Sequence, residues 1–358
     1  MSIILFIIIL SLLVLVHELG HFLLARRNGV RVEEFGFGFP PRLWGIKKGE
    51  TFYSINLIPL GGFVKLFGED GSDGGKLDYS FSSKTIWQRS KIIVAGPLMN
   101  WILAAFLFSV LVLVGIPGPV TESLPGRILA RDIKITELSN SSPAQIADLR
   151  KGDFIEKIKF GGSELPAQDI KSFQENIVDF KGQEIILLIK RDNQLLEKGI
   201  TPRINPPANE GSLGIALEEI IQPTPFYLAP VKGLEITVYL TGAIFQSFYD
   251  LIVDLIYSGR VSGDLTGPVG IARLTSQFYE RGINYLIFFI ALLSLNLGIM
   301  NILPIPALDG GRLLFLMIEK IKGTPINQKL EGAIHSISFF LLIALIIIIT
   351  IKDIRGLL

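Results

Sequence analysis

The sequence of 358 residues contains no cysteine, and its other scarcities narrow the possible functions further. Without a thiol the chain cannot form disulfides, thiolate metal sites or a cysteine nucleophile, and its redox compartment stays open. Histidine occurs only three times, as His17, His21 and His335, so imidazole ligands can come from few places. Excess charge is absent as well. The 34 basic and 33 acidic residues create no global field toward nucleic acid, which we exclude as a partner.

Apolar residues, in contrast, are abundant. They make up 49% of the chain, and the mean hydropathy of +0.49 is too high for a soluble enzyme of this length. The sequence predicts an α-helical membrane protein with four transmembrane helices, each close to the ~20 apolar residues that a bilayer requires. These helices cover about residues 3–24, 92–116, 285–303 and 332–351. No basic residue precedes the first of these and no small-residue cleavage site follows its apolar run, so we do not expect a removable signal peptide.

A further apolar segment, at 234–256, carries Glu235, Asp250 and Asp254. Because carboxylates are costly inside a bilayer, an amphipathic helix at the membrane surface is favoured over a fifth span. The loop between the first two spans holds eleven Lys and Arg residues, whereas none precedes the first span. The positive-inside tendency therefore predicts an extracytoplasmic N-terminus and a cytoplasmic first loop.

The segment after the second span has the composition of a soluble, β-rich domain. Residues 141–147 read as a serine N-cap followed by proline in the first helical turn, and a Gly-Asp turn at 152–153 leads into a strand. A second helix near 170–178 and a final strand follow. This order resembles a bacterial PDZ domain, which adds an extended peptide or a C-terminus to its sheet edge. A β-rich spacer that binds nothing is the alternative.

The first span contains the sequence His17-Glu18-Leu19-Gly20-His21, an H-E-x-x-H arrangement. Histidines four residues apart lie on one face of a helix and can bind one zinc ion, while the glutamate between them can accept a proton from metal-bound water. Three such polar residues in an apolar helix would be costly if they had no partner. A structural role, in which these residues only satisfy one another, is the alternative.

A catalytic zinc site normally has three protein ligands, so one more is needed. His335 begins the fourth span, where a membrane-interface histidine without a metal role is favoured. Asp309 is the better candidate, because two prolines and two glycines at 304–311 predict irregular backbone at the membrane edge, where its carboxylate can be held. An ordinary Asp-Gly turn is the alternative. With the N-terminus outside, His17 and Asp309 both fall in the cytoplasmic half of the membrane.

Taken in order, these motifs resemble the site-2 protease family of intramembrane zinc metalloproteases, in particular its bacterial RseP-like branch. The resemblance extends over nearly the whole chain. It is carried by H-E-x-x-H at 17–21, Gly-Phe-Gly-Phe at 36–39, Pro-Leu-Gly-Gly-Phe-Val-Lys at 59–65, Ala-Gly-Pro-Leu-Met-Asn at 95–100, Gly-Pro-Val-Gly-Ile-Ala at 267–272 and the stretch at 301–311. This chain has room for one PDZ-like domain, where the best-known member type has two.

The resemblance implies hydrolysis of peptide bonds in or near the transmembrane segment of single-span substrates, such as clipped anti-sigma factors or remnant signal peptides. His17, His21 and Asp309 would bind Zn²⁺, and Glu18 would be the catalytic base. The glycine-rich stretches suggest a cytoplasmic, membrane-associated β-hairpin that pairs with the extended substrate, and they make Gly61, Gly62 and Phe63 candidate substrate-binding residues. A lipid-anchored structural loop is the alternative.

Asn301 is a further candidate, because it could hydrogen-bond the unwound substrate, although it could also cap the broken helix. The expected domains are residues 1–117 with two spans and the cytoplasmic loop, a PDZ-like domain at 118–208, an extracytoplasmic linker with the amphipathic helix at 209–280, and two spans with the third ligand at 281–358. The protein would lie in the bacterial inner membrane, with its active site toward the cytoplasm and its PDZ-like domain outside. A zinc-binding membrane transporter and a catalytically inactive PDZ scaffold are the rival functions.

Overall fold

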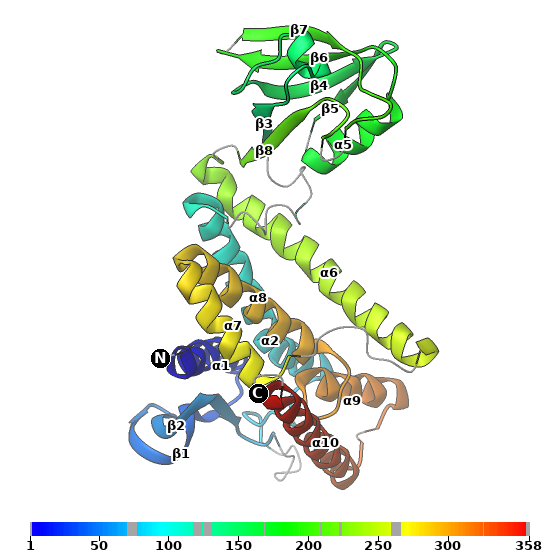
Figure 1. The fold of residues 1–358 in the computed structure, drawn as a ribbon. Helices are drawn as coiled ribbons and strands as arrows, with labels where there is room; N and C mark the ends of the chain where they lie inside the picture. The colour runs from blue at the N-terminus through cyan, green and yellow to red at the C-terminus, as the bar shows by residue number, and fades with distance from the viewer. Residues whose placement is uncertain are drawn as a thin grey trace. The chain divides into compact units, whose positions relative to one another are not determined.

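The computed structural model describes residues 2–69, 77–116, 124, 131–167, 169–192, 194–207, 210–221, 224–258, 266–324 and 326–355. The chain divides into two compact units (Figure 1). Unit 1 combines Met1–Pro117 with Ala229–Leu358, and unit 2 is Gly118–Leu228. The domain boundaries predicted at 117/118 and 208/209 lie outside the described residues.

Unit 1 is mainly helical. Its helices are α1 (Ser2–Arg27), α2 (Ile86–Val114), α6 (Ala229–Ser258), α7 (Pro268–Arg281), α8 (Ile283–Ile302), α9 (Asp309–Lys322) and α10 (Gln328–Arg355). Within the described residues, α1, α2, α6, α8 and α10 are each long and apolar enough to cross a membrane. The chain is thus helical with several candidate membrane spans.

The count of four spans is not confirmed, because α6 also meets the criteria of length and composition. This helix packs antiparallel to α2: Trp101 Nε1 donates a hydrogen bond to Thr241 Oγ1 over 3.1 Å, and a Cβ at Gly233 would overlap Ser109. Two of the acidic groups that argued against a span have local partners. Glu235 pairs with Lys232, and Asp250 accepts a hydrogen bond from Gln246.

Helices α1, α2 and α8 approach one another closely through glycine. A Cβ at Gly20 of α1 would lie 2.2 Å from the carbonyl oxygen of Ala95, and one at Gly298 of α8 would lie 2.9 Å from that of Pro97. Small residues allow such contacts between membrane helices. The first turn of α2 is fixed by a capping box, in which Thr85 and Gln88 accept each other's backbone N–H. This packing holds α1 against the middle of α2.

The first loop forms the predicted hairpin, made of β1 (Val32–Lys48) and β2 (Thr51–Leu66). The strands double back, so that residues 34–37 of β1 pair both with 52–55 and with 62–65 of β2. The second segment of β2 therefore lies at an edge of the sheet. It contacts α1, where Ser11 donates to the carbonyl of Pro59 and a Cβ at Gly61 would lie 3.0 Å from Val14.

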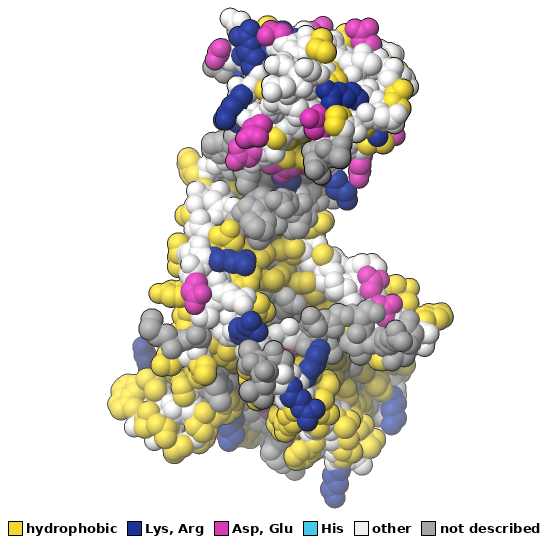
Figure 2. Space-filling model, in the orientation of Figure 1, with side chains coloured by type: hydrophobic (Ala, Val, Ile, Leu, Met, Phe, Trp, Pro, Cys, Tyr) yellow, Lys and Arg dark blue, Asp and Glu magenta, His cyan; other side chains and the backbone are white. Residues whose placement is uncertain are grey.

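Large apolar side chains cover the outer part of this hairpin and remain exposed. Figure 2 shows a hydrophobic surface over β1 and β2. It includes Phe39, Leu43, Trp44, Ile46, Ile55, Leu57 and Ile58. A patch of this kind is unusual on a water-exposed hairpin and is compatible with contact to lipid.

In its described residues, unit 2 is an antiparallel sheet with two α-helices. Its elements are β3 (Arg131–Leu138), α4 (Pro143–Ile146), β4 (Phe154–Phe160), β5 (Ser163–Pro166), α5 (Ile170–Asp179), β6 (Ile185–Arg191), β7 (Gln194–Ile200), β8 (Ile215–Ile221) and the 3₁₀ turn η1 (Phe226–Leu228). The sheet order is β7-β6-β4-β3-β8, and β5 pairs with β4. As predicted, Ser142 caps α4 by accepting the N–H of Gln145, and Pro143 follows it.

The linker predicted at 209–280 differs from the structure at its start, since β8 pairs with β3 and belongs to the sheet of unit 2.

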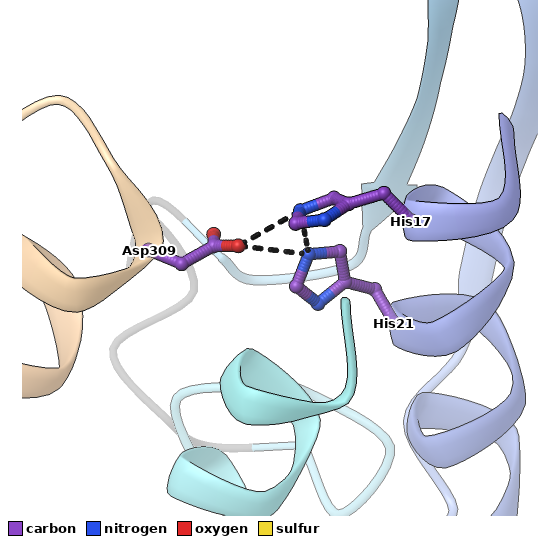
Figure 3. A group of neighbouring side chains, drawn as sticks. All are labelled: His17, His21 and Asp309. Atoms are coloured by element: carbon purple, nitrogen blue, oxygen red, sulfur yellow. Dashed lines mark hydrogen bonds and ion pairs between the residues drawn. The ribbon is translucent and has the colours of Figure 1, made fainter. Parts of the chain in front are cut away.

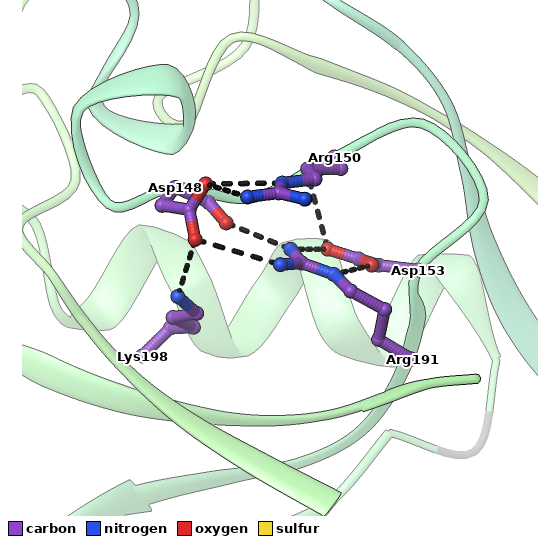
Figure 4. A network of polar contacts seen from close by, with 5 residues as sticks. All are labelled: Asp148, Arg150, Asp153, Arg191 and Lys198. Atoms are coloured by element: carbon purple, nitrogen blue, oxygen red, sulfur yellow. Dashed lines mark hydrogen bonds and ion pairs between the residues drawn. The ribbon is translucent and has the colours of Figure 1, made fainter. Parts of the chain in front are cut away.

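Unit 2 also contains a polar network that joins the turn after α4 to β6 and β7 (Figure 4). The guanidinium of Arg191 donates to both carboxylate oxygens of Asp153, each over 2.7 Å, and Lys198 pairs with Asp148. Asp153 is buried, so this network fixes the turn.

Candidate metal centre

Two histidines one turn apart on α1 and one aspartate at the start of α9 meet inside unit 1 (Figure 3). Nε2 of His17 lies 2.9 Å from Oδ2 of Asp309, and Nε2 of His21 lies 3.3 Å from the same oxygen. The two Nε2 atoms are 3.2 Å apart. One ligand atom from each residue thus lies within 4.8 Å of the others, although 292 residues separate His17 from Asp309.

The irregular backbone expected before Asp309 is present. Helix α8 ends at Ile302, and α9 begins at Asp309 itself. A Cβ at Gly310 would lie 2.0 Å from the carbonyl oxygen of Leu303, so only glycine fits this turn. Ala307 has a φ of 79°, in the left-handed region that residues with a Cβ rarely adopt. The turn brings the Asp309 carboxylate to the histidines.

Both imidazoles are oriented through their second nitrogen. Nδ1 of His21 lies 2.8 Å from the carbonyl oxygen of Ile92, so it carries the proton and leaves Nε2 free to bind a metal. Nδ1 of His17 lies 3.3 Å from the amide nitrogen of Asn100, whose Oδ1 is buried without a partner in the described part of the chain. Because the two ends of an amide are assigned rather than observed, turning it gives Oδ1 the Nδ1–H of His17 as donor.

These residues fit a catalytic zinc ion. Two neutral imidazoles and one carboxylate are a ligand set that leaves a fourth position open. Gly96 provides the room, since a Cβ there would lie 2.3 Å from Nε2 of His21 and 2.7 Å from Nε2 of His17. Oδ2 of Asp309 lies close to both Nε2 atoms, so an ionised carboxylate there completes the ligand set.

The other residues singled out in the sequence lie around this group. Glu18 is partly buried, and its Oε2 accepts the backbone N–H of Val64 from the edge segment of β2 over 3.1 Å. Gly61 and Gly62 lie in the same segment against α1, and the ring of Phe63 stacks on that of Phe39. Glu18, the proposed base, is thus in contact with the edge segment of β2 that is proposed to pair with the substrate.

Asn301 and His335, which the sequence also brought into consideration, are not among these three residues. Asn301, in the last turn of α8, is partly buried, and its side chain makes no hydrogen bond within the described chain, so the capping bond considered for it is not formed. His335 is not part of the group, and its Nδ1 accepts the N–H of Ala307. The contacts of Asn100 and Gly96 with the histidines were missed. The only sequence signal for them is a polar residue close to Gly-Pro in an apolar helix.

Comparison with known proteins gives one consistent result. The model of Peptidase family M50 matches residues 5–345. The chain is 32% identical over 436 residues to the regulator of sigma-W protease RasP of Bacillus subtilis, with 99% of each chain covered. It is 31% identical over 441 residues to the zinc metalloprotease RasP of Bacillus licheniformis, again over 99% of each chain, and 36% identical over 346 residues to a protein of Clostridium perfringens, over 96% of each chain.

Proposed function

The chain belongs to Peptidase family M50, and from this membership we propose that it hydrolyses peptide bonds within or beside the transmembrane helix of single-span membrane proteins. It is a zinc metalloendopeptidase of the site-2 protease type and a multi-pass bacterial membrane protein. The observation that carries the proposal is the group of His17, His21 and Asp309, buried among helices long enough to cross a membrane.

In the proposed mechanism these three residues hold the zinc ion, and Glu18 moves protons. When bound, zinc would act as a Lewis acid that polarises the scissile carbonyl and lowers the pKa of water, so that water can lose a proton near neutral pH. Glu18 accepts the proton that this water loses, and its carboxyl group returns a proton to the amine as the peptide C–N bond breaks. Ile92 and Asn100 keep both imidazoles turned toward the centre of the site.

The substrate must reach this site as an extended chain, because a helix hides its carbonyls in its own hydrogen bonds. The edge segment of β2, with Gly61, Gly62 and Phe63, is the proposed place for it to pair as an added strand. The contact between Val64 of this segment and Glu18 supports the proposal, since a peptide bound along the edge has its backbone beside the base. The side-chain amide of Asn301, which has no hydrogen-bond partner among the described residues, is proposed to hold the unwound substrate on its other side.

The branch of the family, the number of spans and the orientation in the membrane are proposals as well. The chain would be an RseP-like member of the family, with four spans, its active site toward the cytoplasm and unit 2 outside the inner membrane. The exposed apolar residues of the hairpin support its contact with the membrane from the cytoplasmic side. Because one relative is named as a regulator of sigma-W, a clipped anti-sigma factor is the first candidate substrate, and remnant signal peptides are the second.

Unit 2 is proposed to be a single PDZ-like domain that binds an extended peptide or a C-terminus. β8 is an edge strand, and a groove of about 260 Å³ separates it from α5. Apolar side chains line this groove from both sides, and the loop at 211–215 closes its end. Gly214 has a φ of 69°, which lets that loop turn into the strand. An apolar C-terminal side chain with its carboxylate at the loop would suit this shape.

The proteolytic function is tested with the purified full-length protein in lipid vesicles that contain a single-span substrate. Mass mapping of the products should locate the cut within the span or at its edge. Glu18→Gln should keep its zinc but cleave at least about 100-fold more slowly, because general acid–base catalysis contributes that much. Glu50→Gln, on an exposed turn, is the matched control. Cleavage by Glu18→Gln at the wild-type rate would reject the mechanism, and metal transport without cleavage would favour a transporter.

A further inference from the structure

His335, on α10, touches the turn that carries Asp309. Its Nδ1 accepts the backbone N–H of Ala307 over 2.8 Å, and its ring packs on Phe315 of α9 with the centroids 5.4 Å apart. Since Nδ1 is the acceptor, the proton of the neutral ring is on Nε2. That nitrogen is buried and has no hydrogen-bond partner in the described part of the chain. The contact with Ala307 is therefore the one hydrogen bond that this imidazole makes there.

Ala307 is a sensitive point of the turn. It lies two residues before Asp309, and its φ of 79° is a strained conformation for a residue with a Cβ, which persists only where the surroundings hold it. Ala307 lies between α8 and α9, and its N–H is bonded to neither of them but to Nδ1 of His335 on α10. An acceptor from another helix holds this conformation, and His335 is that acceptor.

The rest of α10 makes few polar contacts with the other described elements of unit 1. At its other end, Asp353 accepts the N–H groups of Gly267 and Gly270, and many of its apolar side chains are exposed. A cavity of about 340 Å³ lies beside His335, and its charged lining residues are Glu69, Arg89, Arg312, Glu319 and Glu331. The nearest carboxylate oxygen, on Glu331, is 3.9 Å from Nε2, too far for a hydrogen bond.

We propose that His335 is a positioning residue of the metal centre: by accepting the N–H of Ala307 it fixes the turn that places the Asp309 carboxylate against His17 and His21. The inference rests on the proposed zinc site and adds a residue from the last helix to it. His335 does not bind the metal. Its effect passes through the backbone at 307–309, in the way that partners of metal ligands tune affinity elsewhere.

Two substitutions of His335 separate this role from simple packing. In Asn the side-chain oxygen takes the place of Nδ1, whereas in Gln it takes the place of Nε2. His335→Asn should therefore retain the acceptor for Ala307, and His335→Gln and His335→Ala should lose it. Each full-length variant is purified and stripped of metal. The affinity for zinc is measured by competition with a coloured chelator, and the visible absorption spectrum is recorded with Co²⁺.

We expect His335→Ala and His335→Gln to bind zinc about 10–100-fold more weakly and to change the Co²⁺ spectrum. His335→Asn should stay close to the wild type, as should Glu331→Gln, one turn away on the same helix. Equal zinc affinity and equal spectra for Asn, Gln and wild type would overturn the inference. If His335→Ala does not fold, the Asn and Gln pair still decides. A wild-type protein that binds no zinc would instead refute the metal centre itself.

Discussion

Gly96 of α2 lies directly against His21 of α1, so close that a Cβ in place of its hydrogen would come within 2.3 Å of Nε2. The same Cβ would be 2.7 Å from Nε2 of His17. Both nitrogens are proposed to bind zinc. The space for the metal therefore depends on a glycine, which has no side chain, at this position of another helix.

Gly96→Ala is therefore expected to abolish stoichiometric zinc binding and cleavage, because the methyl group displaces both imidazoles from the shared position. Metal content of the purified variant, measured by mass spectrometry, checks this. Gly242→Ala on α6 is the matched control, since a Cβ there meets nothing within 4 Å. Normal zinc content in Gly96→Ala would mean that the ligands do not converge as described.

Asp309→Ala should lower zinc affinity by at least about 10-fold, as the loss of one of three protein ligands leaves an incomplete site. Competition with a chelator measures the affinity, and activity should return in the wild type, but not in the variant, when zinc is added back after chelation. Asp250→Ala, at an exposed position on α6, controls for the loss of a carboxylate. An unchanged zinc affinity in Asp309→Ala would remove Asp309 from the ligand set.

Asp153→Asn should lower the free energy of unfolding of unit 2 by about 3 kcal/mol, because the buried carboxylate is the bidentate partner of the largely buried Arg191. Proteolysis of the full-length protein in increasing urea reports on this unit. Asp148→Asn, in the same network but half-exposed, should have a much smaller effect. If both variants unfold at the same urea concentration as the wild type, the network is not what stabilises the turn.

The absence of cysteine permits a direct test of topology, since any introduced thiol is the only one. In whole cells, Lys171→Cys in unit 2 should react with an impermeant maleimide, whereas Glu50→Cys and Lys320→Cys should react only after the membrane is permeabilised. The opposite pattern would reverse the proposed orientation.

Tyr257→Cys, near the end of α6, decides the number of spans. The four-span prediction requires labelling from outside, and labelling only after permeabilisation would make α6 a fifth span.

The sequence predicted the parts of the site that depend on local spacing or on composition. The helical period alone puts His17 and His21 on one face, and the prolines and glycines around Asp309 already imply an irregular turn. The contacts of Asn100 with His17 and of His335 with Ala307 depend on how separate helices cross, which no local pattern encodes.

The same limit explains the difference in the fold at the start of the predicted linker. β8 belongs to unit 2 mainly through its pairing with β3, about eighty residues earlier in the chain, which no local pattern encodes. The partners of the acidic groups of α6 are local, in contrast: Glu235 pairs with Lys232, three residues before it, and the number of spans stays a prediction.

The hydrogen bond between Val64 and Glu18 has a consequence for when the enzyme acts. An N–H group makes one good hydrogen bond at a time. A substrate carbonyl that accepts the N–H of Val64 must therefore replace the carboxylate of Glu18 as its acceptor. Binding of the substrate strand would then release the carboxylate of the proposed base from Val64. Until a strand binds, the carboxylate of the proposed base therefore stays engaged with the enzyme's own backbone.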